Sequence, residues 1–250
     1  MTATTPDTST TGAALAAPRR ARHPVVRVAR LQFVAWPYTL PWPWGILALS
    51  FAINLVIFGS VDEADAAWTG GLASIYFVQI FAYVQHFTRG FPFALGMSVT
   101  RRAYYLGTWL YVGLEALAFG AVLLALRFAE SATDGWGVSL EYFGVRFVRE
   151  EGVALQYAVY VVPFLLIAAV GGFLGVVTVR WGGNGLLTLM AGVILTAGVV
   201  VLVVGRAHWW DSVGDWFAGQ SATALFAGWP LPVTVVLGLL GYAMIRRATP

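Results

Sequence analysis

The chain has 250 residues, of which 59% are hydrophobic and only 11% are charged, and its formal net charge is +3. Its mean hydropathy of +0.75 is far above that of a soluble domain, in which about half of the residues are apolar and about a quarter are charged. This composition favours a membrane protein, so the positive net charge does not indicate nucleic-acid binding.

Two residue types are missing. All fifteen basic residues are arginine, and the chain contains neither lysine nor cysteine. A phosphate-binding loop needs a lysine to reach the phosphates, and thiolate metal sites, disulfides and cysteine nucleophiles all need cysteine. The histidines and acids show no metal-ligand spacing on one membrane face, and no serine-elbow or zinc-protease motif occurs. The sequence therefore predicts no metal site, no catalytic residues and no nucleotide site, which favours a transporter or channel subunit over an enzyme.

The N-terminal region divides into two parts. Residues 1–22 are predicted to be a disordered cytoplasmic tail, because Met1–Pro18 is mostly Thr, Ala, Ser and Pro and buries too little to fold. From Pro24 to about Trp36, arginines recur at helical spacing opposite Val28, Ala29 and Gln32. This pattern predicts a basic amphipathic helix in the membrane interface, acting either as an anchor or as a partner-binding element.

Residues 23–250 are predicted to form one domain that is all-α, polytopic and crosses the membrane six times. A spanning helix needs about 20 mostly apolar residues, because backbone groups in hydrocarbon must be bonded within the segment. Six stretches satisfy this: Pro43–Val61, Trp68–Thr88, Ala103–Leu126, Val153–Val179, Gly185–Val204 and Leu225–Ile245.

The arginines predict the orientation of these spans. Eleven of them fall in the tail, in the second and fourth connections and at the C-terminus, against four on the other side. Because cytoplasmic connections carry an excess of arginine and lysine, both termini are predicted to be cytoplasmic, in the plasma membrane. The fourth connection, Arg180–Gly185, is predicted to be a tight turn.

The second cytoplasmic connection, Gly90–Arg102, is too short to span and is unusually apolar. Its apolar side chains are bracketed by arginines, and an exposed apolar patch framed by charge indicates docking. The alternative is a short helix that packs on the protein's own spans. The candidate residues are Arg89, Phe91, Phe93, Leu95, Met97, Arg101 and Arg102.

Two polar residues fall inside predicted spans, Glu115 in the third and Asn54 in the first. A carboxylate at that depth is costly, so Glu115 is expected to face the bundle interior and to be partnered or protonated. Both residues are candidates for a substrate path. For Glu115, substrate or proton handling and a neutral hydrogen bond to a neighbouring span remain open.

Two outer segments are less clearly patterned. Trp136–Val148, within the longest loop, is predicted to contain a short interfacial helix. Arg206–Trp229 is rich in aromatic residues. Within it, Ala207–Ala218 is predicted to form a short helix on the outer leaflet; the alternative is that Arg206–Trp229 dips into the membrane and returns as a re-entrant pair. The fourth span offers close helix packing at Gly171 and Gly175.

The residues Phe91-Pro92-Phe93-Ala94-Leu95-Gly96-Met97-Ser98-Val99-Thr100-Arg101-Arg102, followed by Tyr105-Leu106-Gly107-Thr108, resemble a stretch of type-2 ATP-binding-cassette exporter permeases of high-GC Gram-positive bacteria. The outer Gly135-Trp136-Gly137-Val138 is also similar to that group. The resemblance implies a permease subunit in which Gly90–Arg102 contacts a separate ATPase subunit. It also implies a second permease chain around the substrate path, with ATP and Mg²⁺ held by the partner.

The sequence leaves three functions open. The first is an export permease driven by ATP hydrolysis on a partner, with no cofactor in this chain and an unidentified substrate. The second is a non-transporting sensor or immunity protein that uses the same connection to bind another cytoplasmic protein. The third is a proton-coupled carrier that uses Glu115.

Overall fold

The computed structural model describes residues 23–34, 40–60 and 69–247, and within these ranges it contains helices and loops but no strand. The predicted all-α class is therefore confirmed. The predicted disordered tail, 1–22, lies outside the described residues, as do 35–39 and the first outer loop at 61–68.

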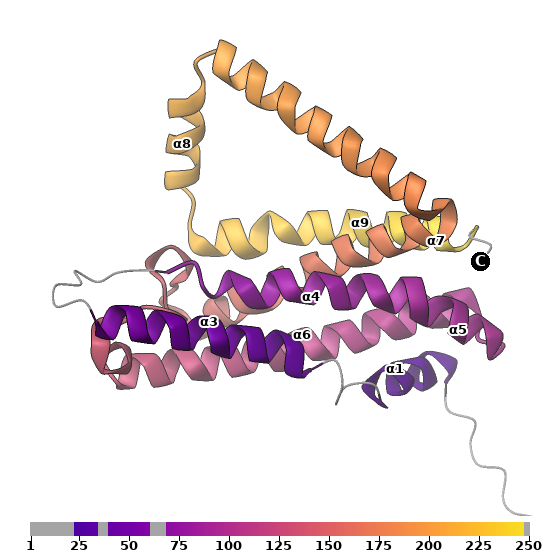
Figure 1. Cartoon of the computed structure of the whole chain (residues 1–250), viewed down its shortest axis with the longest axis horizontal. Helices are drawn as coiled ribbons and strands as arrows, with labels where there is room; N and C mark the ends of the chain where they lie inside the picture. The colour runs from indigo at the N-terminus through magenta and orange to yellow at the C-terminus, as the bar shows by residue number, and fades with distance from the viewer. Residues whose placement is uncertain (1–22, 35–39, 61–68, 248–250) are drawn as a thin grey trace, which may run out of the picture.

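Five helices build the body of the molecule (Figure 1): α3 (Pro41–Gly59), α4 (Ala73–Gln85), α6 (Arg101–Ala132), α7 (Val153–Arg206) and α9 (Pro230–Ile245). Four stretches are long and apolar enough to cross a membrane, namely Pro41–Gly59, Arg101–Ala132, Val153–Arg206 and Ala224–Ile245. These helices support a membrane-embedded protein. The predicted number of spans is six, and it stays a prediction. Two of the six are not among these four helices as separate elements: α4, in the second predicted span, has only 13 residues, and α7 runs through both the fourth and the fifth predicted spans.

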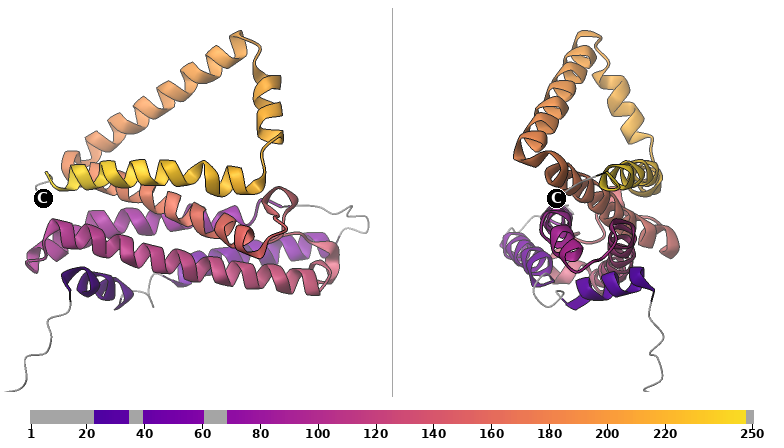
Figure 2. Two further views of the ribbon diagram at one scale, coloured as in Figure 1. Left: turned by 180° about the vertical axis from the view of Figure 1, so that it is seen from behind. Right: turned by 90° about the vertical axis from the view of Figure 1, so that its right-hand side faces the viewer.

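Helix α7 changes direction at Gly182, whose φ of +68° and ψ of −168° are not helical. Glycine reaches this conformation without the steric cost that a Cβ brings, so the predicted turn in Arg180–Gly185 is confirmed. The arm after the turn diverges from the bundle and forms a triangle with α8 (Trp210–Ala218) and α9 (Figures 1 and 2). The predicted short helix within Ala207–Ala218 thus exists, as α8.

The first arm of α7 packs closely on α4 and on the π-helical turn η1 (His86–Gly90) that follows it. A Cβ added at Gly171 would lie 2.8 Å from the Tyr83 Cβ, and one at Gly175 would lie 2.6 Å from the Phe87 Cβ. Only glycine permits this approach, as expected for small residues at membrane helix contacts.

The loop between α6 and α7, residues 133–152, is the one predicted to lie outside, and we keep the name outer loop for it; it folds back into the bundle instead of forming the predicted helix at Trp136–Val148. That prediction is wrong: Trp136 (φ +60°) and Gly137 (φ +75°) are left-handed, and only Arg146–Val148 forms a short 3₁₀ turn, η3. Leu140 and Tyr142 are fully buried. The loop therefore closes the outer end of the bundle as part of its core.

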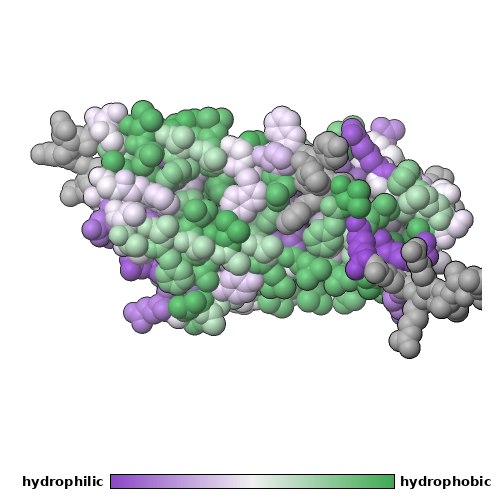
Figure 3. All heavy atoms as spheres, turned by 90° about the horizontal axis from the view of Figure 1, so that it is seen from below, coloured by the Kyte–Doolittle hydropathy of each residue, from purple (hydrophilic) through white to green (hydrophobic). Residues whose placement is uncertain are grey.

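Charged residues gather toward the two ends of the molecule (Figure 3), and a broad apolar band lies between them. In Figure 1, α1 (Pro24–Val34), the turn of α7 and the C-terminus lie at one end, and the outer loop lies at the other. The arginine-rich segments thus share one end, which we call the arginine-rich end.

Candidate functional site

The predicted docking segment forms a short helix at the arginine-rich end. Helix α5 (Phe91–Gly96) follows α4 through η1, and Thr100 then begins α6 by accepting a hydrogen bond from the Ala103 amide at 3.2 Å. The Tyr104 hydroxyl donates to the His86 carbonyl, satisfying a backbone group in the wide turn of η1. Helix α5 is therefore held between the end of α4 with η1 and the start of α6.

The four apolar candidates of this segment form two pairs, one packed against the bundle and one exposed. Phe91 is fully buried, its ring 5.5 Å from that of Tyr104, and Leu95 packs on the same cluster. Phe93 and Met97 are 62% and 46% exposed. Residues four apart lie on one face of a helix and residues two apart do not, so the first pair faces the bundle and the second pair faces outward.

The three arginines of the segment differ in their exposure and in their hydrogen bonds. Arg89 and Arg102 are exposed. Arg101 is partly buried and donates from Nη1 to the Arg246 carbonyl at 3.1 Å. Arg101 therefore holds the C-terminal end of α9 beside α6, whereas Arg89 and Arg102, which bracket α5 in the sequence, remain exposed.

Helix α1 packs on α6 at the same end. Val28, Ala29 and Gln32 are buried, whereas Arg27 and Arg30 are exposed, as the two-faced pattern predicted. The Gln32 amide donates to the Thr108 hydroxyl at 2.7 Å. A helix bonded in this way is fixed to the bundle, and its location in a membrane interface stays a prediction.

Glu115 faces the bundle interior, as its depth in the sequence led us to expect. It is 3% exposed and accepts hydrogen bonds from the Gln79 amide at 3.0 Å and from the Tyr111 hydroxyl at 2.8 Å. Asn54 instead donates to the Ser50 carbonyl of its own helix at 2.8 Å. The two candidates for a substrate path are thus bonded in different parts of the molecule, and that role stays a prediction for both.

A second buried carboxylate, Glu130, holds the outer loop, and it was not singled out from the sequence. It is 5% exposed. Its two oxygens accept the backbone N–H groups of Tyr142, Phe143 and Gly144 at 2.9, 2.8 and 2.7 Å, and the Trp136 indole donates to it at 3.3 Å. The sequence gives only a weak signal for this role of Glu130, because most of the groups that Glu130 binds are backbone N–H groups, which every residue except proline has.

Tyr142, in the loop that Glu130 organises, bonds this loop to helix α3. Burial raises the pKa of the Tyr142 hydroxyl, which stays protonated and donates to the Leu47 carbonyl at 3.4 Å. At the far end of the loop, the Glu150 carboxylate accepts from the Thr223 amide and hydroxyl at 2.5 and 2.7 Å. The outer end is therefore bonded to the segment that leads into α9.

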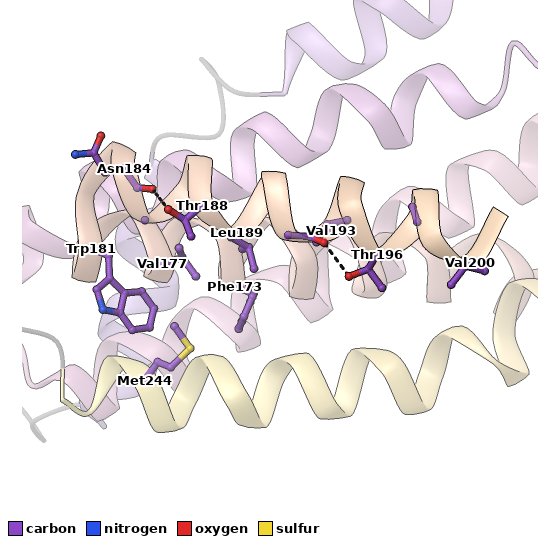
Figure 4. A pocket seen from close by; sticks show the side chains of 13 residues that line it. Phe173, Val177, Trp181, Asn184, Thr188, Leu189, Val193, Thr196, Val200 and Met244 are labelled. Atoms are coloured by element: carbon purple, nitrogen blue, oxygen red, sulfur yellow. Dashed lines mark hydrogen bonds between the residues drawn. The ribbon is translucent and has the colours of Figure 1, made fainter. Parts of the chain in front are cut away.

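An apolar groove of about 1110 Å³ lies between the two arms of α7 and the end of α9 (Figure 4). Its two threonines, Thr188 and Thr196, bond back to the carbonyls of Asn184 and Gly192, so the groove offers few polar groups. In a bilayer, such a surface meets lipid chains. Within the described ranges no group of three or more His, Asp or Glu residues could hold a metal ion.

Comparison with known proteins found no family model, no curated protein and no solved structure that matches this chain.

Proposed function

We propose that this chain is the membrane-spanning permease subunit of an ATP-binding-cassette exporter, located in the plasma membrane with both termini in the cytoplasm. A separate subunit binds and hydrolyses ATP, and this chain moves the substrate. The six predicted spans pair with those of a second permease chain around the path. The resemblance of the α5 segment to type-2 exporter permeases is one support.

The observation that carries the proposal is the outward face of α5. Phe93 and Met97 leave apolar surface exposed at the arginine-rich end, where water or lipid headgroups would otherwise meet it. Arg89 and Arg102 flank it. Apolar anchors with a charged rim are typical of protein interfaces, in which a few buried anchors supply most of the binding energy.

The same helix is suited to transmit movement. Phe91 packs on Tyr104 of α6, and η1 joins α5 to α4 without a flexible loop. A partner that displaces α5 therefore displaces the ends of α4 and α6 together. Rigid movement of one helix group against another is how transporters alternate access.

We expect the double variant Phe93→Asp/Met97→Asp to lower the amount of ATPase that co-purifies with the full chain from native membranes by about tenfold or more. Losing one anchor residue of an interface costs about 2 kcal/mol of binding free energy, and a loss of about 1.4 kcal/mol already weakens binding tenfold. The matched control is Val34→Asp, a charge placed on an exposed apolar residue of α1 (74% exposed) at the same end, which is expected to retain the ATPase.

Phe91→Asp is a comparison for folding, because Phe91 is fully buried and an unpaired charge there disrupts α5 itself. The proposal is contradicted if the unmodified chain captures no ATPase. It is equally contradicted if Phe93→Asp/Met97→Asp retains all of it with an unchanged unfolding transition.

A further inference from the structure

The interface between α4 and α6 contains a cluster of buried polar side chains that the docking surface does not use. Helix α4 and its extension η1 present Gln79, Tyr83 and His86 at successive turns of one face. Helix α6 presents Tyr111 and Glu115 one turn apart, and both bond as described above. Gln79, Tyr83, Tyr111 and Glu115 are all buried.

The cluster contains two polar atoms whose hydrogen-bonding capacity is unused. The Gln79 Oε1 atom and the Tyr83 hydroxyl are buried and have no hydrogen-bond partner among the described residues. The Tyr83 phenol nevertheless lies beside both Gln79 and Glu115. A buried polar group left unpaired is costly, and such groups mark the place of a bound water or of a functional exchange.

The amide of Gln79 can serve either protonation state of Glu115. In the arrangement observed, Gln79 donates to Glu115 Oε2, which suits a carboxylate that only accepts. Turned over about its terminal bond, the amide would present Oε1 to the O–H of a protonated Glu115. The site can therefore hold or release one proton without any movement of its helices.

A cavity of about 10 Å³ lies next to the cluster, toward the arginine-rich end. Its polar lining comes from Tyr83, His86 and Thr108, and the rest is apolar or aromatic. This volume is that of one water probe, so the cavity excludes an organic substrate. Because Tyr83 contributes to the cavity wall and also lies beside Glu115, it bridges the two.

Within the described part of the chain, the walls of the cavity beside the cluster carry no acid and no arginine. Helix α7 contributes Ala168, Ala169 and Gly172 to the cavity wall, and α1 contributes Phe33, whose ring is 5.0 Å from that of Tyr111. Among the described residues, the titratable groups near the cluster are Tyr83 and His86 from α4 and η1, and Tyr104, Tyr105 and Tyr111 from α6. No arginine of the described ranges is buried.

We propose that Glu115 is a proton-binding site inside the bundle, reached from the arginine-rich end through His86, a water in the small cavity and Tyr83. On uptake, the Tyr83 hydroxyl gives its proton to the Glu115 carboxylate and takes one from the water, which is replenished past His86. The balance is one proton taken up from the cytoplasmic side and one charge neutralised. The site is independent of whether α5 docks on an ATPase.

The test uses the full chain in lipid nanodiscs and infrared difference spectroscopy, which detects the carbonyl stretch of a protonated carboxylic acid. We expect a band that appears reversibly as pH falls, that shifts in D₂O and that is lost in Glu115→Gln. Gln keeps the size and hydrogen bonding of the side chain, so this variant is expected to fold.

A second variant separates the relay from the carboxyl group. Tyr83→Phe removes the bridging hydroxyl and is expected to slow deuterium exchange of the Glu115 band by about tenfold, the effect of about 1.36 kcal/mol on a barrier. Tyr160→Phe is the matched control, since its buried hydroxyl bonds to the Phe143 carbonyl at 2.6 Å and does not line the cavity. The proposal is overturned if no reversible band is lost in Glu115→Gln, or if Tyr83→Phe exchanges as fast as the unmodified chain.

Discussion

Glu130→Gln is expected to release the outer loop and to lower the free energy of unfolding by about 3 kcal/mol, because hydrogen bonds to a charged group contribute about 1.5–3 kcal/mol each. The carboxylate accepts three consecutive backbone N–H groups between 2.7 and 2.9 Å. Glutamine keeps one acceptor oxygen and turns an NH₂ group toward the remaining donors. Unfolding by titration with denaturing detergent measures the loss.

The control for this variant is Glu151→Gln, which removes the same charge from an exposed position of the same loop and is expected to change stability little. Equal unfolding transitions for Glu130→Gln and the unmodified chain would show that the loop does not depend on this carboxylate. Protease cleavage within residues 135–148 is a second readout, since a released loop is cut faster.

Gly175→Leu is expected to separate the first arm of α7 from η1 and to cost about 3 kcal/mol, the upper part of the usual range for overpacking. A Cβ at this position lies 2.6 Å from the Phe87 Cβ and 3.0 Å from the Val84 carbonyl oxygen, and neither can move without moving the helix. We expect a lower melting temperature of the purified chain in detergent.

Gly192→Leu is the matched control, because nothing lies within 4 Å of a Cβ built at Gly192 in the diverging arm of α7. It introduces the same side chain into the same helix and is expected to leave the melting temperature nearly unchanged. If the two variants melt alike, the close contact of α7 with η1 is not a stabilising feature of the fold.

Hydropathy predicted where along the chain helices form, but not which residues of one helix contact which residues of another. Long apolar runs, proline at helix starts and the glycine turn near Gly182 are local signals, and all of them appear in the structure. The placement of Glu115 in the interior also follows from local physics, because a charge in hydrocarbon is costly. Its bond to Gln79 could not be predicted, since the two residues are 36 positions apart.

The docking segment shows where an apolar pattern is ambiguous. Phe91, Phe93, Leu95 and Met97 alternate along the sequence and were treated as one set of anchors. Once the segment is helical, the alternation divides into two faces, and Phe91 and Leu95 belong to the core. The helical state decides which pair is available to a partner.

The outer loop was mispredicted for a different reason. The mixture of apolar and charged residues in Trp136–Val148 favoured an interfacial helix, but the loop is shaped by Glu130, which precedes it and gathers its amide groups. A backbone conformation that depends on one buried carboxylate leaves no periodicity in the sequence. Sequence patterns report side-chain faces and not such backbone contacts.

The most direct test of the account is the side of the membrane on which α5 lies. The chain has no cysteine, so Phe93→Cys in the arginine-rich end and Ser139→Cys in the outer loop, both exposed positions, can each be labelled alone with a membrane-impermeant maleimide in intact cells. If α5 lies in the cytoplasm, Ser139→Cys is labelled in intact cells and Phe93→Cys is labelled only after the cells are opened. Labelling of Phe93→Cys in intact cells would place α5 outside and contradict its docking on a cytoplasmic ATPase.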